Sequence, residues 1–225
     1  MKRIILTGSE GLIGSSVKKY LLEKEYECIC VDLKLGHDLT NEKFVKEFFK
    51  ENLASGLVNL FALNHHIDAT HEKNDLFNIE LSSFEDYLKI NLTSLFSVCR
   101  EFARNNKKGS IVNFSSTYGV TSPVKSLYEG EEKHIGYSVS KSGVIMLSKH
   151  LATHLSPSIR VNTIIPGGVY NKQSQLFVQK YSKLTPMGRM MKAEELNGIV
   201  EYLLSDLSSY VTGTEFKIEG GWTSW

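Results

Sequence analysis

The sequence is poor in the residues that mark unusual architectures. It contains three cysteines, four prolines and two tryptophans among 225 residues. A small, odd number of cysteines without paired spacing argues against a disulfide framework and agrees with a reducing compartment. Cys28 and Cys30 point to one face of a predicted strand, where we expect them to pack in the core rather than bind a metal.

The sequence also lacks an excess of charge of either sign and any long apolar run. Lysine and arginine total 26 against 25 aspartate and glutamate residues, a net charge of +1. This balance gives no electrostatic reason to expect nucleic acid, membrane or strongly acidic partners. The apolar runs are far shorter than a membrane span, and the first residues enter a β-branched run that leaves no room for a signal peptide. We therefore expect a cytoplasmic protein.

What the sequence does contain is an alternation of short apolar runs and helical patterns. With 41% hydrophobic residues the chain can bury one sizeable core, and we predict a single domain spanning 1–225. Apolar runs bounded by Gly, Asp, Ser or Pro predict strands at 2–6, 27–31, 56–61, 110–115, 160–165 and 215–218. Helical patterns between them predict an α/β fold, a doubly wound parallel sheet with helices on both faces.

A glycine-rich turn follows the first predicted strand. Gly8, Gly11 and Gly14 precede a helical pattern, and the second strand ends in Asp32. Glycines there let the backbone approach a pyrophosphate, and the acidic residue suits the ribose hydroxyls of a dinucleotide. Asp32 favours NAD over NADP because its carboxylate would repel a 2′-phosphate, although Lys34 could meet such a phosphate and leaves NADP open.

Tyr137 and Lys141 lie four residues apart in a helical pattern, so they share one face. We expect the ammonium to lower the pKa of the phenol, which could then exchange a proton with a substrate hydroxyl or carbonyl. Ser116 follows the fourth predicted strand and could hold the substrate oxygen beside the phenol. Ser115 is its alternative, because neighbouring strand residues face opposite ways.

These residues resemble the landmarks of the short-chain dehydrogenase/reductase family, in the family's order and over nearly the whole chain. The turn Thr7–Gly14, the segment Lys89-Ile-Asn91, the strand ending in Ser116 and the pair Tyr137 and Lys141 carry the resemblance. It implies a Rossmann-type sheet and a catalytic tetrad of Asn91, Ser116, Tyr137 and Lys141. Asn91 would anchor a water that relays protons; otherwise it bonds its own helix backbone.

The resemblance also implies which residues bind the coenzyme. Those residues are Gly8, Gly11, Leu12, Ile13, Gly14, Asp32, Asp38, Asn59, Tyr137, Lys141, Pro166, Gly167 and Val169. Asp38 is equally well explained as a helix-start signal. The implied activity is NAD(P)-dependent interconversion of a secondary alcohol and a ketone. The family further implies a homodimer or homotetramer, with contacts through 83–104, 136–155 and the last strand.

Two departures from the family pattern bear on the substrate and the coenzyme. Asn59-Leu-Phe-Ala62 replaces the family's Asn-Asn-Ala-Gly and makes the backbone near the coenzyme bulkier. Tyr137 lies 21 positions after Ser116, a longer spacing than short members usually have. The extra segment resembles that of flagellin-modification and acidic-sugar-pathway oxidoreductases, which suggests a sugar or sugar-nucleotide substrate. Tyr118, Tyr128, Glu129 and Tyr170 are candidate contacts to it.

Two other classes of function stay open. An epimerase or dehydratase would use bound NAD transiently, as the glycine spacing allows. A non-catalytic dinucleotide-binding protein would fit the bulky Leu60-Phe61 pair.

His65 and His66 suggest a metal site, but we predict no metal and expect these to be loop histidines. Segments near 62–82, 117–135 and 167–185 are expected to cover the substrate as mobile loops, and Trp222 and Trp225 to make an interface or lid contact.

Overall fold

The structure is a computed structural model that describes residues 2–64, 76–128 and 132–225. Six strands form one sheet in the order β2-β1-β3-β4-β5-β6, and every neighbouring pair is parallel. The strands are β1 (Arg3–Thr7), β2 (Glu27–Val31), β3 (Gly56–Asn59), β4 (Gly109–Phe114), β5 (Ile159–Pro166) and β6 (Glu215–Ile218). All six lie where the sequence predicts them, and the doubly wound α/β fold is confirmed.

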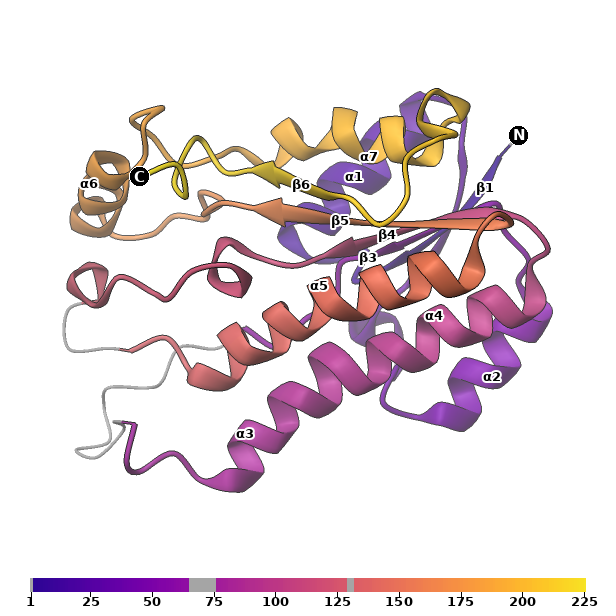
Figure 1. Ribbon diagram of the computed structural model, residues 1–225, viewed down its shortest axis with the longest axis horizontal. Helices are drawn as coiled ribbons and strands as arrows, with labels where there is room; N and C mark the ends of the chain where they lie inside the picture. Colours follow the sequence, from indigo (N-terminus) through magenta and orange to yellow (C-terminus); the bar gives the residue numbers. More distant parts are fainter. Residues whose placement is uncertain (1, 65–75, 129–131) are drawn as a thin grey trace.

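Helices cover both faces of this sheet (Figure 1). On one face lie α1 (Leu12–Glu23) and α7 (Asn197–Leu204); on the other lie α2 (Glu42–Glu51), α4 (Ser94–Asn105) and α5 (Ile135–Leu155). The strands are apolar on both sides because both sides are buried. Ile5, Leu57 and Ile111 pack under α2, α4 and α5, whereas Ile4 and Val58 pack under α1 and α7. This alternation divides the core into two layers.

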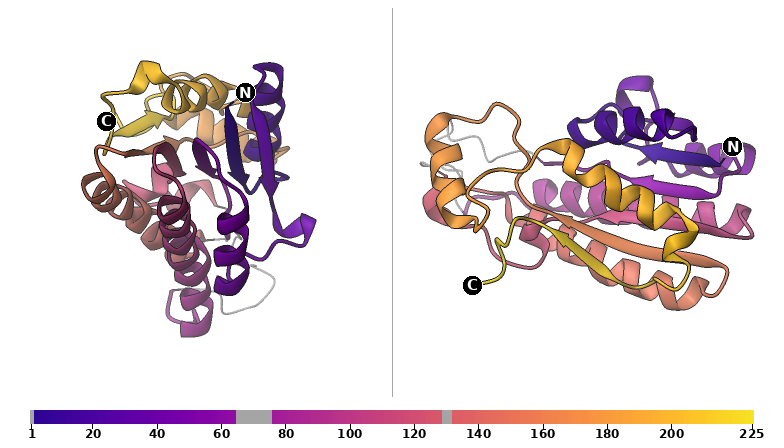
Figure 2. Two further views of the ribbon diagram at one scale, coloured as in Figure 1. Left: turned by 90° about the vertical axis from the view of Figure 1, so that its right-hand side faces the viewer. Right: turned by 90° about the horizontal axis from the view of Figure 1, so that it is seen from above.

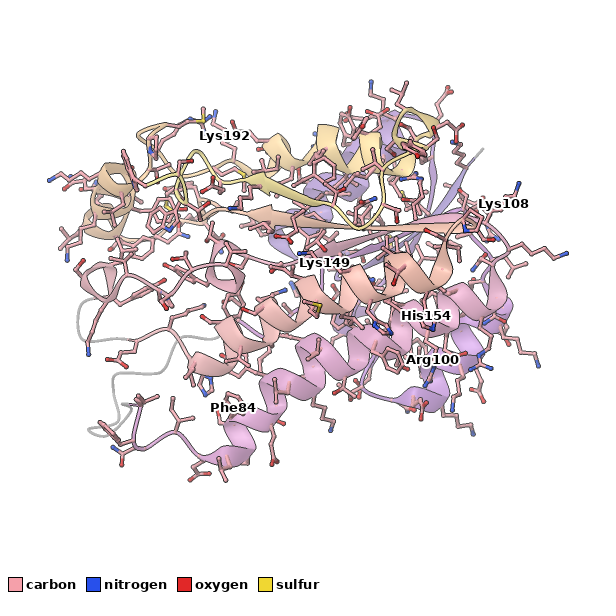
Figure 3. All side chains as sticks on the ribbon, viewed as in Figure 1. Phe84, Arg100, Lys108, Lys149, His154 and Lys192 are labelled. Atoms are coloured by element: carbon pink, nitrogen blue, oxygen red, sulfur yellow. The ribbon has the colours of Figure 1, made fainter. Side chains whose placement is uncertain are left out.

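The aromatic residues of α2 lie where helical spacing predicts. Phe49 is fully buried, while Phe44 and Phe48 are partly buried against the same core. Arg100 of α4, labelled in Figure 3, bonds Glu42 at 2.6 Å and so joins α4 to the start of α2. Cys28 and Cys30 are half-buried free thiols on β2; Cys28 packs against the core under α1 and α7 as predicted, whereas Cys30 is not part of a core cluster.

The strand order reverses between β1 and β3, because the chain passes from β1 outward to β2 and then returns to β3 on the other side. At such a switch point the loops after the two strands diverge and leave a crevice at the carboxyl ends. Helix α6 (Gln175–Leu184) stands at this end of the molecule, opposite the N-terminus, as the right view of Figure 2 shows. The crevice and α6 therefore share one end of the sheet.

The segment 167–185 is more ordered than the expected mobile loop. Ser174 accepts a hydrogen bond from the backbone N–H of Phe177 and caps α6. Phe177 and Tyr181 lie on one face of this helix and pack with Leu127 and Trp222. The sequence analysis missed this helix because its apolar stripe is short and polar residues surround it.

The segments before and after α4 are less regular. Helix α3 (Leu81–Leu88) passes into α4 through a wide turn, η2 (Lys89–Thr93), with π-type hydrogen bonding. Short 3-10 turns occur at η1 (Leu33–Leu35), η3 (Thr117–Gly119), η4 (Lys125–Leu127), η5 (Ala193–Leu196) and η6 (Asp206–Ser208). Wide π-type turns within helices are frequent at functional sites, and η2 carries Asn91.

Candidate active site

A cavity of about 850 Å³ lies at the carboxyl ends of β1, β3, β4 and β5. It is lined by the glycine turn on one side and by the end of β4 and the start of α5 on the other. The predicted site residues among its lining are Gly8, Gly11, Leu12, Ile13, Gly14, Ser116, Tyr137, Lys141, Pro166, Gly167 and Val169. One cavity thus brings together most of the residues predicted for the coenzyme and for catalysis.

The glycine turn is closed so tightly that side chains cannot enter it. Gly8 has a φ of +72°, and a Cβ there would lie 2.5 Å from the backbone nitrogen of Phe61. A Cβ on Gly14 would lie 2.0 Å from the carbonyl oxygen of Gly8. The turn leads into α1, whose first turn has no acidic residue. Free backbone N–H groups and the positive end of the helix dipole make this cradle suitable for a pyrophosphate.

Asp32 lies at the end of β2, beside this turn. Its carboxylate accepts hydrogen bonds from the backbone N–H of Glu10 at 3.0 Å and of Lys34 at 2.9 Å. The ammonium of Lys34 donates to the carbonyl of Glu10 at 3.2 Å. Asp32 therefore braces the glycine turn, with Lys34 beside it, although neither residue is among those that line the cavity.

Asp38 and Asn59 are not among the residues that line the cavity. The carboxylate of Asp38 accepts hydrogen bonds from the N–H and hydroxyl of Thr40, both at 2.8 Å, and Asn41 caps α2. The side chain of Asn59 is buried between strands, where it accepts from Thr7 at 2.9 Å. Both side chains are engaged in local structure: Asp38 makes a turn with Thr40 while Asn41, not Asp38, caps α2, and the Asn59 amide joins neighbouring strands.

The bulky Leu60-Phe61 pair leaves the cavity open. Leu60 packs with the core under α1 and α7, and Phe61 packs with the opposite core under α2, α4 and α5. Leu60 and Ala62 line the cavity. The two large side chains can be accommodated because successive residues after a strand point to opposite faces. Gly8 lies against the backbone of this pair rather than against its side chains.

Two neighbouring serines after β4 face different ways. The hydroxyl of Ser115 donates to the backbone carbonyl of Lys141 at 2.7 Å. Ser116 accepts a hydrogen bond from the N–H of Tyr118 at 3.2 Å, and its side chain lies near enough to the Tyr137 phenol to lower the pKa of that phenol. The structure therefore brings Ser116, rather than its alternative Ser115, to the phenol.

The Tyr137 phenol is almost completely buried, and burial raises its pKa. The side chain of Ser116 acts in the opposite direction. The predicted lowering by Lys141 is not found: the Lys141 ammonium lies 5.9 Å from the centre of the Tyr137 ring and donates to the carbonyl of Phe114 at 2.9 Å. Desolvation therefore outweighs the lowering effect of Ser116 at the phenol.

Lys141 itself is buried, and its environment opposes its charge. Burial and, to a smaller extent, the charge of Lys133 lower the pKa of the Lys141 ammonium to about 8. An amine with a pKa near neutrality can change protonation state at working pH. Burial thus moves the pKa of Tyr137 upward, away from neutrality, and the pKa of Lys141 downward, toward neutrality.

Asn91 lies in η2, away from the cavity lining. Its side-chain amide accepts from the N–H of Leu63 at 2.6 Å and donates to the carbonyl of Leu63 at 3.1 Å. It also donates to the hydroxyl of Ser140 at 3.0 Å. These bonds join the loop after β3 to α5, so the Asn91 amide positions neighbouring segments and does not bond its own helix backbone.

The Pro166-Gly167 turn after β5 is held by contacts that the sequence did not indicate. The phenol oxygen of Tyr181 accepts from the N–H of Gly168 at 2.5 Å. Val169 pairs with Met191 in an isolated bridge. Trp222 is buried and stacks on Tyr181 with ring centres 4.4 Å apart, in agreement with a lid contact, whereas Trp225 is exposed.

Several cavity residues were missed or only partly anticipated. Tyr118 and Tyr128, two candidate substrate contacts, both line the cavity, and the Tyr128 hydroxyl donates a hydrogen bond to the Tyr118 hydroxyl at 2.8 Å. Tyr170 is half-exposed and outside the lining, and Glu129 lies outside the described residues. Lys133 and Asn64 also line the cavity and were not predicted. Lys133 lies four residues before Tyr137, and Lys141 lies four residues after it. A spacing of four places two side chains on one face only within a helix, and Lys133 precedes α5, so the spacing did not identify it.

Among the residues that the structure describes, there is neither a candidate metal cluster nor a helix that could span a membrane. In the parts of the chain that the structure describes, no group of three or more His, Cys, Asp or Glu side chains could hold a metal ion. His65 and His66 lie outside these parts. Among the described helices, none is long and apolar enough to cross a membrane.

Comparison with known proteins identifies the family. A family model described as Enoyl-(Acyl carrier protein) reductase matches residues 16–223. The chain is 30% identical to the post-translational flagellin modification protein A of Campylobacter coli, over 98% of each chain. It is 32% identical to the 3-oxoacyl-(acyl-carrier-protein) reductase FabG of Aquifex aeolicus, over 97% of this chain and 86% of that protein.

A solved structure agrees with these matches. The short-chain dehydrogenase of Leptospira borgpetersenii serovar Hardjo-bovis, solved with bound NAD+, has a TM-score of 0.88 and 32% sequence identity. The alignment covers 99% of this chain and 92% of that one. From these matches and from the parallel sheet with its glycine turn, we conclude that the chain belongs to the short-chain dehydrogenase/reductase family of oxidoreductases.

Proposed function

We propose that the protein interconverts a secondary alcohol and a ketone of a small, polar, carbohydrate-like molecule, with NAD as coenzyme. One observation carries this proposal: the glycine turn and the group of Ser116, Tyr137 and Lys141 line the same cavity. A coenzyme held by the turn and a substrate held at the phenol would therefore meet. Short-chain dehydrogenases are oxidoreductases, and this arrangement supports the simplest reaction of that type.

The glycine turn, the N-terminus of α1, Asp32 and the Pro166-Gly167 turn would hold the dinucleotide. The backbone is so close at Gly8 and Gly14 that a Cβ could not be placed there, and this close approach supports the fit of a pyrophosphate. When bound, the nicotinamide supplies or accepts the hydride, which the protein's own side chains cannot do. Asp32 supports NAD, and Lys34, which donates to the Glu10 carbonyl, keeps NADP as the alternative.

Tyr137 is the proposed general acid and base. In reduction its phenol donates a proton to the carbonyl oxygen, and in oxidation the phenolate removes the proton from the hydroxyl. Ser116, whose side chain lies beside the phenol, would hold the same substrate oxygen. Lys141 would stabilise the phenolate and bind the ribose of the coenzyme, and Asn91 would anchor a water that returns the proton to Lys141.

The lining of the cavity supports a polar substrate. Beside the reacting group it presents the hydroxyls of Tyr118 and Tyr128, the amides of Asn64, Asn171 and Gln173, and the hydroxyls of Thr117 and Ser174. Groups of this kind bind the hydroxyls of a sugar or sugar nucleotide.

We further propose that the chain is a single cytoplasmic domain that works as a homodimer or homotetramer. The outer face of α5 exposes Val139 and Met146, and α4 exposes Phe96. Apolar side chains grouped on neighbouring helices suit a contact between copies. Sedimentation velocity would test this, and a monomer at micromolar concentration would contradict it.

Titration with NADH and NADPH tests the proposed function. We expect tight NADH binding, followed by loss of the reduced nicotinamide signal when keto-sugars or keto sugar nucleotides are added. The Tyr137→Phe variant should bind NADH almost unchanged and lose turnover by at least about 100-fold. Retained activity in this variant would refute the assigned mechanism.

The same titration separates the other two classes. Coenzyme returned unchanged after conversion of a sugar nucleotide would favour an epimerase or dehydratase. Binding with neither consumption nor conversion, across the panel, would favour a non-catalytic protein. Absence of any coenzyme binding would refute all three interpretations of the cavity.

A further inference from the structure

A second ammonium group faces the proposed catalytic tyrosine. Lys133 precedes α5, and its Nζ lies 4.4 Å from the centre of the Tyr137 ring. Lys141 approaches the same ring at 5.9 Å. The Lys133 side chain is hydrogen-bonded to the Oδ1 of Asn64, another cavity residue. Lys133 therefore lies beside the position that a substrate bound at the phenol would occupy.

The described lining of the cavity carries positive charge without a compensating carboxylate. Its described lining contains Lys133 and Lys141 and no aspartate or glutamate. The neighbour of Lys133 in sequence, Glu132, is paired with Lys125 at 2.6 Å. Lys141 is committed to the carbonyl of Phe114 and, in the proposed function, to the coenzyme. Lys133 is thus the ammonium left for a substrate.

The charged side chain of Lys133 destabilises the ligand-free protein. An ammonium removed from water without an anionic partner is unfavourable, and a second ammonium nearby adds repulsion. Burial lowers the pKa of Lys133 to about 8, and its charge in turn lowers the pKa values of Lys141 and of the adjacent His134. Within the described lining, the Lys133 ammonium donates to one acceptor, the side-chain amide oxygen of Asn64, although an ammonium carries three donors.

We propose that the substrate carries an anionic oxygen group, a carboxylate or a phosphate ester, and that Lys133 binds this group. The inference rests on the proposed function, because it places the reacting carbinol or carbonyl at Tyr137. An anion beside Lys133 would supply the missing counter-charge and use the free donors. The contact of Lys133 with the ring of Tyr137 puts that group close to the reacting carbon. Lys133 is then a specificity-determining residue rather than part of proton transfer.

Calorimetric titration of the NAD-loaded protein with three polyols of equal chain length tests this inference. D-glucitol is neutral, D-gluconate carries a carboxylate, and D-glucitol 6-phosphate carries a phosphate ester. We expect at least one anion to bind about 10- to 100-fold more tightly than D-glucitol, the range of a hydrogen bond to a charged group. The tighter of the two anions identifies which group the site takes.

Variants at Lys133 assign that preference to this side chain. Lys133→Met keeps the apolar stem and removes the charge, and it should abolish the preference for the anion. Lys133→Arg should retain part of it. Lys43→Met is the matched control, because Lys43 is an exposed lysine of α2 and its loss changes the net charge equally. The control should keep the wild-type preference.

The outcomes separate this inference from the proposed function. Equal binding of the three polyols, no binding of any, or a preference that survives in Lys133→Met would overturn the anion site. If Lys133→Met loses the preference while wild-type protein never consumes coenzyme, the anion site stands and the oxidoreductase proposal fails. Unchanged NADH affinity and a cooperative thermal transition would show that Lys133→Met is folded.

Discussion

Ser115 donates a 2.7 Å hydrogen bond from its hydroxyl to the backbone carbonyl of Lys141, which ties the end of β4 to the helix that carries Tyr137. A methyl group on Gly119 would lie 2.5 Å from the same hydroxyl, so the turn after β4 packs closely around it. Ser116, one residue later, turns to the phenol instead. Two adjacent serines therefore have separate tasks, one in holding the site together and one in the site itself.

The two serines should respond differently to substitution. Ser116→Ala should reduce kcat by about 100-fold or more, because a group that orients the substrate oxygen is lost, and should leave unfolding almost unchanged. Ser115→Ala should lower the free energy of unfolding by about 1 kcal/mol, the worth of one buried hydrogen bond, with a smaller effect on kcat. Urea unfolding and steady-state kinetics measure both. The reverse pattern would exchange the assignments.

Gly14→Ala should damage the glycine turn. The added methyl would stand 2.0 Å from the Gly8 carbonyl oxygen, and backbone atoms cannot yield as a flexible side chain does. We expect a loss of about 1–3 kcal/mol in stability and weaker NADH binding.

Gly198→Ala is the matched control for that variant. It adds the same methyl to α7, where nothing lies within 4 Å, and should raise stability by about 0.5 kcal/mol. NADH fluorescence titration and thermal unfolding would report both variants. Wild-type NADH affinity in Gly14→Ala would remove the turn from the proposed coenzyme site.

Asp32→Ala should weaken NADH more than NADPH. The carboxylate is the proposed partner of the ribose hydroxyls, and loss of a charged hydrogen bond costs about 10-fold or more in affinity. A smaller loss for both coenzymes should come from the turn, which Asp32 braces through the N–H groups of Glu10 and Lys34. Lys34→Met is the counterpart and should affect NADPH only. An equal loss for both coenzymes in Asp32→Ala would contradict the NAD preference.

Lys133→Met should make the ligand-free protein more stable at pH 7. In the folded state the pKa of Lys133 is about 8, against an ordinary value of 10.5, so the folded protein holds this proton more weakly than the unfolded chain. The cost is full below pH 8 and falls as the folded state loses the proton above pH 8. The gain in melting temperature should therefore be largest at pH 7 and shrink toward pH 10.

Other charged groups near Lys133 do not change this expectation. Lys141 and His134 are present in both proteins, and removal of the Lys133 charge relieves both of them. Thermal unfolding of wild type, Lys133→Met and Lys43→Met from pH 6 to pH 10 would provide the comparison. A gain that is independent of pH would mean that packing, not charge, explains the difference.

The fold and much of the site could be predicted because they depend on local pattern. Apolar runs predict buried strands. The three glycines indicate a turn whose backbone atoms approach too closely for a side chain. Tyr137 and Lys141 could be paired because both lie on one helix. Ser115 and Ser116 could be reduced to two alternatives by strand geometry, but which one meets the phenol depends on the helix that packs against β4.

The residues that could not be predicted act across distances in sequence. Tyr181 of α6 holds Gly168, Asn64 meets Lys133, and Asn91 joins the loop after β3 to α5. Each contact exists because parallel strands bring separate loops to the same end of the sheet. The expected charge effect of Lys141 on Tyr137 was wrong for a related reason, since burial is a property of the packed site.

The sequence by itself determined the parallel sheet, the glycine turn and the candidate reacting side chains that we propose, because periodicity and backbone sterics act between near neighbours in the chain. Only the tertiary structure decided which serine faces Tyr137, how the Leu60-Phe61 pair leaves the cavity open, and that two ammonium groups share one tyrosine. Those features arise from packing and desolvation, which depend on segments that the chain brings together only when it folds.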